Sequence, residues 1–181
     1  GLVLPIYDVK CNDREGNALP TGATGEICVR SSQVIKGYLN RPDATAQTIV
    51  DGWLRTGDIG YVDADNFIFL VDRAKEMVLR GGENVYCSEV ETALYRHPAV
   101  AECSVFSVPD ERLGEEVGAA IYPAAGARPN AAELREFCKT QLAAYKAPRY
   151  IWILDEPLPR NASGKFVKRA LQDSLDIAAA G

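Results

Sequence analysis

The sequence predicts an α+β protein, with a β-rich first part and a second part in which strands alternate with helices. Residues 1–71 consist of short apolar or alternating runs separated by turn residues, which is the pattern of strands. Residues 72–181 alternate strand-like pairs with segments of helical periodicity, which is typical of a compact α+β domain. The two parts meet at Asp72-Arg73, where an apolar run stops at a charged pair.

The β-rich part contains several strand-like runs and one short helix. A helix is predicted over residues 42–48, because proline is favoured in the first helical turn. Thr56-Gly57-Asp58 is expected to form a turn between two strands, and residues 63–66 a hairpin loop. The strand-like runs are residues 2–10, 25–30, 53–55, 59–62 and 67–71.

The second part opens with a short antiparallel hairpin over residues 77–86, in which Gly81-Gly82 forms the turn. Ser88 is then placed as a helix N-cap and Glu91 at the spacing of a capping box, so a helix is predicted to start there and to stop before the next proline. The remaining expected elements are strands at residues 100–108, 117–122 and 150–154, a loop at 157–164, and helices at 131–142 and 165–175.

Composition excludes several classes of protein. The chain has 181 residues, of which 47% are hydrophobic and 25% charged, which is typical of a globular protein. A net charge of −5 argues against a nucleic-acid partner, and no apolar run approaches the roughly 20 residues of a membrane span. No secretion signal is visible. The cysteines are scattered and form no C-x-x-C pair, so we expect free thiols and a cytoplasmic location.

Two charged positions near the middle of the chain could bind a nucleotide. The carboxylate of Asp58, on the expected tight turn, can accept two hydrogen bonds from a ribose diol. The guanidinium of Arg73 is a fixed cationic fork that suits phosphate or ribose oxygens. On local grounds, an ordinary Gly-Asp turn and a solvated charge pair at a strand end remain the alternatives.

Two glycine-containing segments are further candidates. Lys165 lies on a loop rich in small residues, where it could act as a movable charge that meets negative charge developing in a reaction. The segment is not a Walker loop, because Pro159 replaces its first glycine and Phe166 the residue that contacts magnesium. Gly81-Gly82 would let a narrow ligand approach the backbone closely. The alternatives are a surface lysine that opens a helix and a plain hairpin turn.

Other chemistries find no support in the sequence. His97 is the only histidine, so a His-rich metal site is impossible, and its position at a helix end before Pro98 does not suit a catalytic triad. No G-x-G-x-x-G dinucleotide fingerprint occurs. We therefore expect no metal site within this chain.

The order and spacing of the motifs resemble the C-terminal third of the adenylate-forming superfamily, which includes acyl-CoA synthetases, aryl-CoA ligases, luciferase and peptide-synthetase adenylation domains. The resemblance runs through nearly the whole chain. Its blocks are Gly-Glu-Ile at 25–27 leading to Gly-Tyr at 37–38 and Pro at 42, Gly-Trp-Leu-Arg-Thr-Gly-Asp at 52–58, Asp-Arg at 72–73 with Gly-Gly-Glu-Asn-Val-Tyr at 81–86 and Glu-Val-Glu at 89–91, His-Pro-Ala-Val at 97–100, and Leu-Pro-Arg-Asn-Ala-Ser-Gly-Lys at 158–165.

The resemblance implies two domains. Residues 1–71 would be the last β-rich subdomain of a large N-terminal domain, and residues 72–181 a small mobile α+β domain with a mixed sheet, flanking helices and a hinge at Asp72. The chain starts at Gly1 within a strand-like run, so we expect a fragment. The family's phosphate loop, acyl pocket and Mg²⁺ site would lie upstream in the missing part of the N-terminal domain, and the fragment alone is expected to be inactive.

The resemblance also implies a first reaction step. In this family, a carboxylate attacks the α-phosphate of Mg-ATP and forms an acyl-adenylate and pyrophosphate. The residue that matches Asp58 holds the ribose hydroxyls, and the residue that matches Arg73 helps to hold the nucleotide. The residue that matches Lys165 bridges the α-phosphate and the substrate carboxylate.

In the second implied step, the thiol of CoA displaces AMP. The small domain would rotate about Asp72, which would remove the catalytic lysine and bring Gly81, Gly82 and Glu83 to the CoA channel. A glycine-rich hairpin suits such a channel, because a pantetheine arm needs backbone contact without side-chain obstruction.

The sequence leaves the acid and the acceptor open. The hairpin sequence at residues 81–86 resembles that of ligases that use free CoA, so we favour an AMP-forming acyl-CoA ligase, with a fatty acid as the first choice of substrate and an aromatic acid as the second. One alternative is an adenylation domain that loads a carrier protein. Another is a non-catalytic binding module derived from a ligase.

Overall fold

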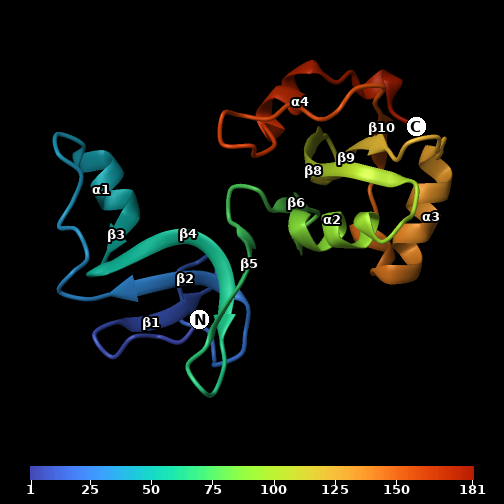
Figure 1. The fold of residues 1–181 in the computed structure, drawn as a ribbon. Coiled ribbons are helices and arrows are strands. Elements are labelled where there is room, and N and C mark those ends of the chain that lie inside the picture. The colour runs from blue at the N-terminus through green and yellow to red at the C-terminus, as the bar shows by residue number, and fades with distance from the viewer. The chain divides into compact units, whose positions relative to one another are not determined.

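A computed structural model describes residues 1–181. The chain divides into two compact units, Gly1–Lys75 and Glu76–Gly181, and each is described by itself (Figure 1). Asp72, the expected hinge, lies in the last strand of the first unit. The assignment of the units to a truncated N-terminal domain and a mobile C-terminal domain stays a prediction.

The first unit is an antiparallel sheet of five strands. The order is β1-β2-β4-β3, and β5 pairs with β4. A short helix precedes the two-residue strand β3. The elements are β1 (Asp8–Asn12), β2 (Gly25–Arg30), α1 (Pro42–Thr48), β3 (Ile49–Val50), β4 (Trp53–Val62) and β5 (Ile68–Arg73).

The buried residues of the first unit lie on β1, β2 and β4. They include Cys11, Ile27, Cys28 and Ile59. Gly60 is required where β4 and β5 approach each other closely, because a Cβ there would collide with the carbonyl of the paired strand. Strand β4 is the central strand of this unit, because it pairs with β2, β3 and β5.

The structure confirms some of the expected elements of this unit and corrects others. The strand at 25–30 and the helix at 42–48 have the predicted bounds. The predicted strand at 2–10 starts too early, since β1 starts only at Asp8. The turn predicted at residues 56–58 is also wrong: β4 is continuous through it. Strand β2 pairs on either side of the segment, across a β-bulge, and β5 pairs with it at Asp58.

The second unit has a five-stranded mixed sheet, as the sequence predicts. The order is β10-β9-β6-β7, with β8 paired to β9, and only β10 runs parallel to its neighbour. Its strands are β6 (Val78–Arg80), β7 (Glu83–Val85), β8 (Val100–Asp110), β9 (Gly114–Pro123) and β10 (Tyr150–Ile153).

Helices cover both faces of this second sheet (Figure 1). One cluster of buried residues joins the sheet to α2 and α3, through Leu94 and Leu134 among others. A second cluster joins the opposite face to α4, through Phe106, Trp152 and Leu171. The helices are α2 (Cys87–Tyr95), α3 (Ala131–Gln141) and α4 (Lys168–Ser174), with 3₁₀ turns η1 (Ala144–Lys146) and η2 (Ile177–Ala179).

Two helix starts differ from the predictions. The N-cap of α2 is Tyr86, without a side-chain cap, and Ser88 lies inside the helix. The capping box fails because the Glu91 carboxylate instead accepts a hydrogen bond from the Val105 amide at 2.9 Å. Helix α4 starts at Lys168, so the loop before it is longer than expected. None of the helices combines the length and the apolar character that a membrane-spanning helix needs.

Candidate functional site

The structure brings the two predicted nucleotide-binding residues together. Asp58 on β4 is in register with Arg73 on β5, and Arg73 Nε lies 3.0 Å from Asp58 Oδ1. The side chain of Arg73 is 68% exposed and that of Asp58 29% exposed, so both can be reached from solvent. An arginine fork bound through Nε keeps further N–H donors for a ligand.

The backbone that presents Asp58 is held by neighbouring residues that were not among the predicted site residues. Gly57 has a φ of +73°, in the left-handed region, and its amide donates to Glu26 Oε1 at 3.2 Å. The Asp58 amide donates to Thr56 Oγ1 at 3.1 Å. Arg55 binds the other oxygen of Glu26 at 2.8 and 2.6 Å. Glu26, Thr56 and Arg55 all fall in the blocks that resemble the family, which was the available signal.

Asp72 lies next to this pair at the end of β5. Its carboxylate accepts a hydrogen bond from the Arg73 amide at 2.8 Å. One residue further, the Ala74 amide donates to the Gly57 carbonyl at 2.9 Å. The chain leaving β5 is therefore fastened to the bend that carries Asp58. The hinge role of Asp72 stays a prediction.

Lys165 lies on a tightly bonded loop rather than at a helix start. The Asn161 side-chain oxygen accepts hydrogen bonds from the amides of Ser163 and Lys165, each at 3.0 Å. Gly164 has a φ of +80°, which permits the turn. The Lys165 side chain is exposed and takes part in no ion pair. A fixed backbone thus presents a cation to solvent.

The same loop is fastened to the sheet through Arg160. Its Nη1 donates to the Gly164 carbonyl at 2.8 Å, and its Nη2 to Glu102 Oε1 at 2.9 Å. The guanidinium also lies 4.1 Å from the centre of the Phe166 ring. The hydrogen bond from Arg160, assisted by one from the Leu158 amide, lowers the pKa of Glu102 despite partial burial.

Lys168, at the start of α4, binds two carboxylates. Its Nζ lies 3.0 Å from Glu76 Oε2 and 3.0 Å from Glu91 Oε1. Burial alone would lower the pKa of Lys168, but the adjacent Cys87 sulfur and the two carboxylates outweigh it and raise the pKa. The charged Lys168 side chain therefore links α4 to α2 through Glu91, and to the start of the second unit through Glu76.

The Gly81-Gly82 turn has the predicted hairpin form. Gly81 has a φ of +58° and Gly82 of +91°, and both values lie in the region that favours glycine. The turn is exposed, as is Glu83 at the start of β7. The Gly81 amide donates to the Leu113 carbonyl at 2.9 Å, while a Cβ on Gly82 would enter open space. The backbone of Gly82 is accessible to a narrow ligand.

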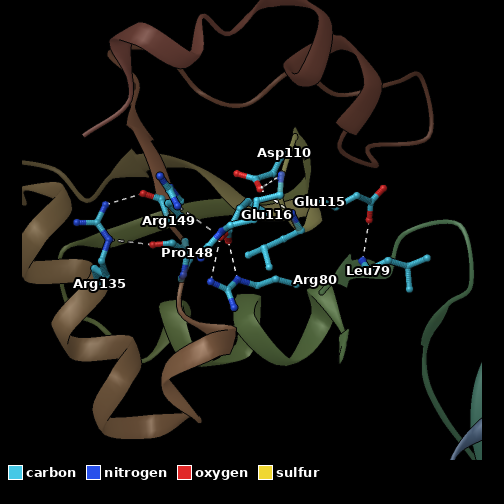
Figure 2. A network of polar contacts seen from close by, with 10 residues as sticks. Leu79, Arg80, Asp110, Glu115, Glu116, Arg135, Pro148 and Arg149 are labelled. Carbon is cyan, nitrogen blue, oxygen red and sulfur yellow. Dashed lines mark hydrogen bonds and ion pairs between the residues drawn. The ribbon is translucent and has the colours of Figure 1, made fainter. Parts of the chain in front are cut away.

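A polar network lies directly beside this turn (Figure 2). Arg80 Nε donates to Glu116 Oε2 at 2.7 Å, and Arg80 Nη2 to Glu116 Oε1 at 2.9 Å. The Glu116 side chain is fully buried, and Arg149 Nη1 lies 3.7 Å from it. The Leu79 amide donates to Glu115 Oε2 at 2.7 Å. Sequence interpretation missed this network, because its members are distant along the chain.

The candidate residues are distributed over both units. Asp58, Asp72 and Arg73 belong to the first unit, and the other candidates to the second. No group of three side chains of the kinds that bind metal ions occurs in the structure.

Known proteins match this chain in sequence and in structure. The family model described as the AMP-binding enzyme C-terminal domain matches residues 89–165. The fatty acid–[acyl-carrier-protein] ligase of Streptomyces coeruleorubidus is 47% identical over 174 residues, which are 96% of this chain and 33% of that protein. The 2-succinylbenzoate–CoA ligase of Geobacillus kaustophilus is 45% identical over 169 residues, which are 93% of this chain and 34% of that protein.

The o-succinylbenzoate CoA synthetase from Bacillus subtilis, solved in complex with an acyl-adenylate intermediate, matches with a TM-score of 0.80 at 38% identity, over 95% of this chain and 35% of that one. Residues 89–165 match the AMP-binding enzyme C-terminal domain family, and nearly the whole chain is similar to the C-terminal part of adenylate-forming enzymes. The chain spans about a third of the length of the curated relatives that it matches.

Proposed function

We propose that this chain is part of an ATP-dependent, AMP-forming ligase that activates a carboxylic acid as an acyl-adenylate and transfers the acyl group to CoA. The observation that carries the proposal is the rigid loop that ends at Lys165. It presents an exposed, unpaired cation at the last residue of the matched family segment. The adenylate bound by one structural relative supports this chemistry.

In the first half-reaction, a carboxylate oxygen bonds to the α-phosphorus of ATP, and the bond to pyrophosphate breaks. Asp58 would accept hydrogen bonds from the ribose hydroxyls, while Arg73 donates to nucleotide oxygens through its remaining N–H groups. Lys165 would lie between the α-phosphate and the acid, where its charge offsets the repulsion between two anions. Mg²⁺ bound to ATP would supply further charge neutralisation.

In the second half-reaction, the CoA sulfur bonds to the acyl carbon and the bond to AMP breaks. We propose that the second unit turns about Asp72 between the steps. A lysine that serves adenylation would obstruct the thiol, so one mobile domain presents two faces in turn. The second face is the Gly81-Gly82 turn with Glu83, where backbone exposure admits the pantetheine arm.

We propose a fatty acid as the first choice of substrate and an aromatic acid as the second. One relative is named for fatty acids and another for 2-succinylbenzoate, so both choices have a counterpart. The acyl pocket and the phosphate loop are expected in sequence upstream of this chain. A carrier protein is the second candidate for the acceptor, because the Streptomyces coeruleorubidus relative is named as an acyl-carrier-protein ligase.

The test is made on the full-length enzyme. Lys165→Ala should abolish ATP–pyrophosphate exchange, while thioester formation from a supplied acyl-adenylate continues at nearly the wild-type rate. Lys139→Ala is the control, since Lys139 is also exposed but pairs with Glu136 at 2.6 Å. An equal loss of both half-reactions in Lys165→Ala would contradict the assigned role.

The acceptor is decided separately. Turnover with free CoA supports the CoA ligase, whereas turnover only with a phosphopantetheinylated carrier protein supports the second candidate. Calorimetric titration of residues 1–181 with ATP and AMP tests the non-catalytic module. Tight nucleotide binding by this segment, with no adenylation by the full-length protein, would favour the module.

A further inference from the structure

We propose that Arg80 and Glu116 are positioning residues for the acyl-transfer step. Their ion pair holds the Gly81-Gly82 turn at a fixed place on β9, so that transfer to the thiol depends on the pair while adenylation does not. This inference rests on the proposed function, which assigns the turn to the path of the thiol.

The backbone attachment of the hairpin to the sheet is small. Strand β6 has three residues and pairs with β9 at a single register position, Arg80 opposite Gly114. The Gly81 amide adds one hydrogen bond, to the Leu113 carbonyl. The Leu79 amide uses a side chain, Glu115, instead of the backbone of β9. Side chains therefore hold much of this hairpin in place.

The Arg80–Glu116 pair is the strongest of these attachments. Both carboxylate oxygens of Glu116 accept a hydrogen bond from the same guanidinium, at 2.7 and 2.9 Å. Two parallel hydrogen bonds fix the orientation of a guanidinium as well as its position. Glu116 has no exposed surface, so its charge requires this partner, and Arg149 at 3.7 Å is too distant to replace a hydrogen bond.

The turn itself cannot set its own orientation. Gly81 and Gly82 have the largest backbone freedom of any residue type, and both adopt left-handed values of φ. Arg80 immediately precedes them in the chain, so a rotation of Arg80 is transmitted directly to the turn. On the other side of the Glu116 carboxylate, the backbone of Arg149 is held by Arg135, which donates to the Arg149 carbonyl at 2.8 Å (Figure 2).

The residues that hold Lys165 form a separate set. Asn161, Arg160 and Glu102 fasten that loop, and none of them contacts Arg80 or Glu116 through a hydrogen bond or ion pair. A change in the Arg80–Glu116 pair should therefore move the turn without moving the lysine. The two half-reactions should respond differently to the same substitution.

The experiment uses Arg80→Lys and Glu116→Gln in the full-length enzyme, with ATP, a panel of fatty and aromatic acids, and CoA. Arg80→Lys keeps the charge that Glu116 needs and removes only the two-point fork. We expect transfer from a supplied acyl-adenylate to fall by about tenfold to a hundredfold, with a higher KM for CoA, since small misplacements cost rates of this order. The rate of ATP–pyrophosphate exchange should stay within about twofold of the wild-type rate, which is less than the tenfold change that corresponds to about 1.4 kcal/mol.

Arg30→Lys is the matched control. It makes the same change in an exposed pair of the first unit, where Arg30 binds Asp8 at 3.1 and 3.0 Å, and should leave both half-reactions unchanged. Thermal unfolding of each variant shows whether it is folded. If Arg80→Lys does not fold, Glu116→Gln provides the test instead, because glutamine preserves the shape of glutamate and one hydrogen-bond acceptor.

Two outcomes overturn the inference alone: normal transfer to CoA in both folded variants, or an equal fall in both half-reactions. Failure of the proposed function gives a different result, since the wild-type enzyme would then form no adenylate with any acid of the panel.

Discussion

Arg73 Nε lies 3.0 Å from Asp58 Oδ1, where the last residue of β5 pairs with the middle of β4. The two residues are distant in sequence, and the sheet register places them side by side. Each orients the other, and both remain accessible. A carboxylate that accepts from a diol and a guanidinium that donates to anionic oxygens complement a ribose phosphate.

Asp58→Asn in the full-length enzyme should raise the KM for ATP in pyrophosphate exchange by about tenfold to a hundredfold. A hydrogen bond to a charged group contributes about 1.5–3 kcal/mol, and the neutral amide loses most of it. Arg73 is exposed and Asp58 is partly exposed, so the free energy of unfolding should change by about 1 kcal/mol or less. Asp8→Asn, which removes the exposed Asp8–Arg30 pair, should leave the KM unchanged. A normal KM in Asp58→Asn would exclude the ribose contact.

Gly82→Leu should slow acyl transfer to CoA at least about tenfold more than adenylation, since the side chain would fill the open space over the turn. Both half-reactions are measured separately. Gly82→Ala is the matched control, because it shares the backbone strain at a φ of +91° but adds little bulk. If leucine and alanine slow transfer equally, strain rather than obstruction is the cause and the channel assignment fails.

The loop that carries Lys165 should lose support in acid. Arg160 lowers the pKa of Glu102 from its ordinary value of 4.5. A carboxyl group whose pKa is lower in the folded than in the unfolded protein stabilises the fold above the unfolded value, and this contribution is lost as the pH falls through the folded value. We therefore expect the wild-type protein to be more stable than Glu102→Gln at pH 6, and the difference to shrink as the pH falls and Glu102 becomes protonated in the folded protein.

Urea unfolding of the wild-type and Glu102→Gln enzymes at several pH values measures this difference. Asp155→Asn serves as a control for a change at an exposed acid near the same loop. A difference between wild type and Glu102→Gln that is constant from pH 6 to about pH 3 would show that the ionised carboxylate contributes nothing.

Lys168→Met should lower the free energy of unfolding by about 3 kcal/mol, because it leaves the partly buried carboxylates of Glu76 and Glu91 without their cation. The pKa of Lys168 is raised, so its contribution is complete below the unfolded value of about 10.4 and is lost only as the pH rises through the higher folded value. The loss should accordingly be the same at pH 7 and about pH 9.

Chemical denaturation at both pH values provides the measurement. Lys168→Arg keeps the cation and should recover most of the loss. Arg169→Met, at the next residue, removes only an exposed pair with Asp173 at 3.8 Å and should change stability by less than about 0.5 kcal/mol. If Lys168→Met and Arg169→Met change the stability equally, solvent rather than Lys168 satisfies the carboxylates of Glu76 and Glu91.

Sequence interpretation succeeded where structure is local. The strand at 25–30, the helix at 42–48 and the Gly81-Gly82 hairpin follow from alternation, an early proline and paired glycines, which act within a few residues. It failed at Thr56-Gly57-Asp58, where pairing of the flanking residues with β2 and of Asp58 with β5 keeps a turn-like triplet within a strand, as a β-bulge.

The start of α4 shows the same limit. Lysine at 165 was expected to begin the helix, but the Asn161 side chain closes the loop around residues 161–165 and delays the helix to Lys168. The capping residues of α2 were misjudged because Glu91 is bound by partners from β8 and α4. Such contacts join residues far apart in the chain.

The α+β class, the order of most elements and the resemblance to the family follow from the sequence, because they depend on periodicity and on ordered motifs. The ion pair between Asp58 and Arg73, and the one between buried Glu116 and Arg80 beside the glycine turn, are visible only in the tertiary structure. The physical reason is that sheet register and burial set these distances, and neither leaves a pattern that can be read within one segment.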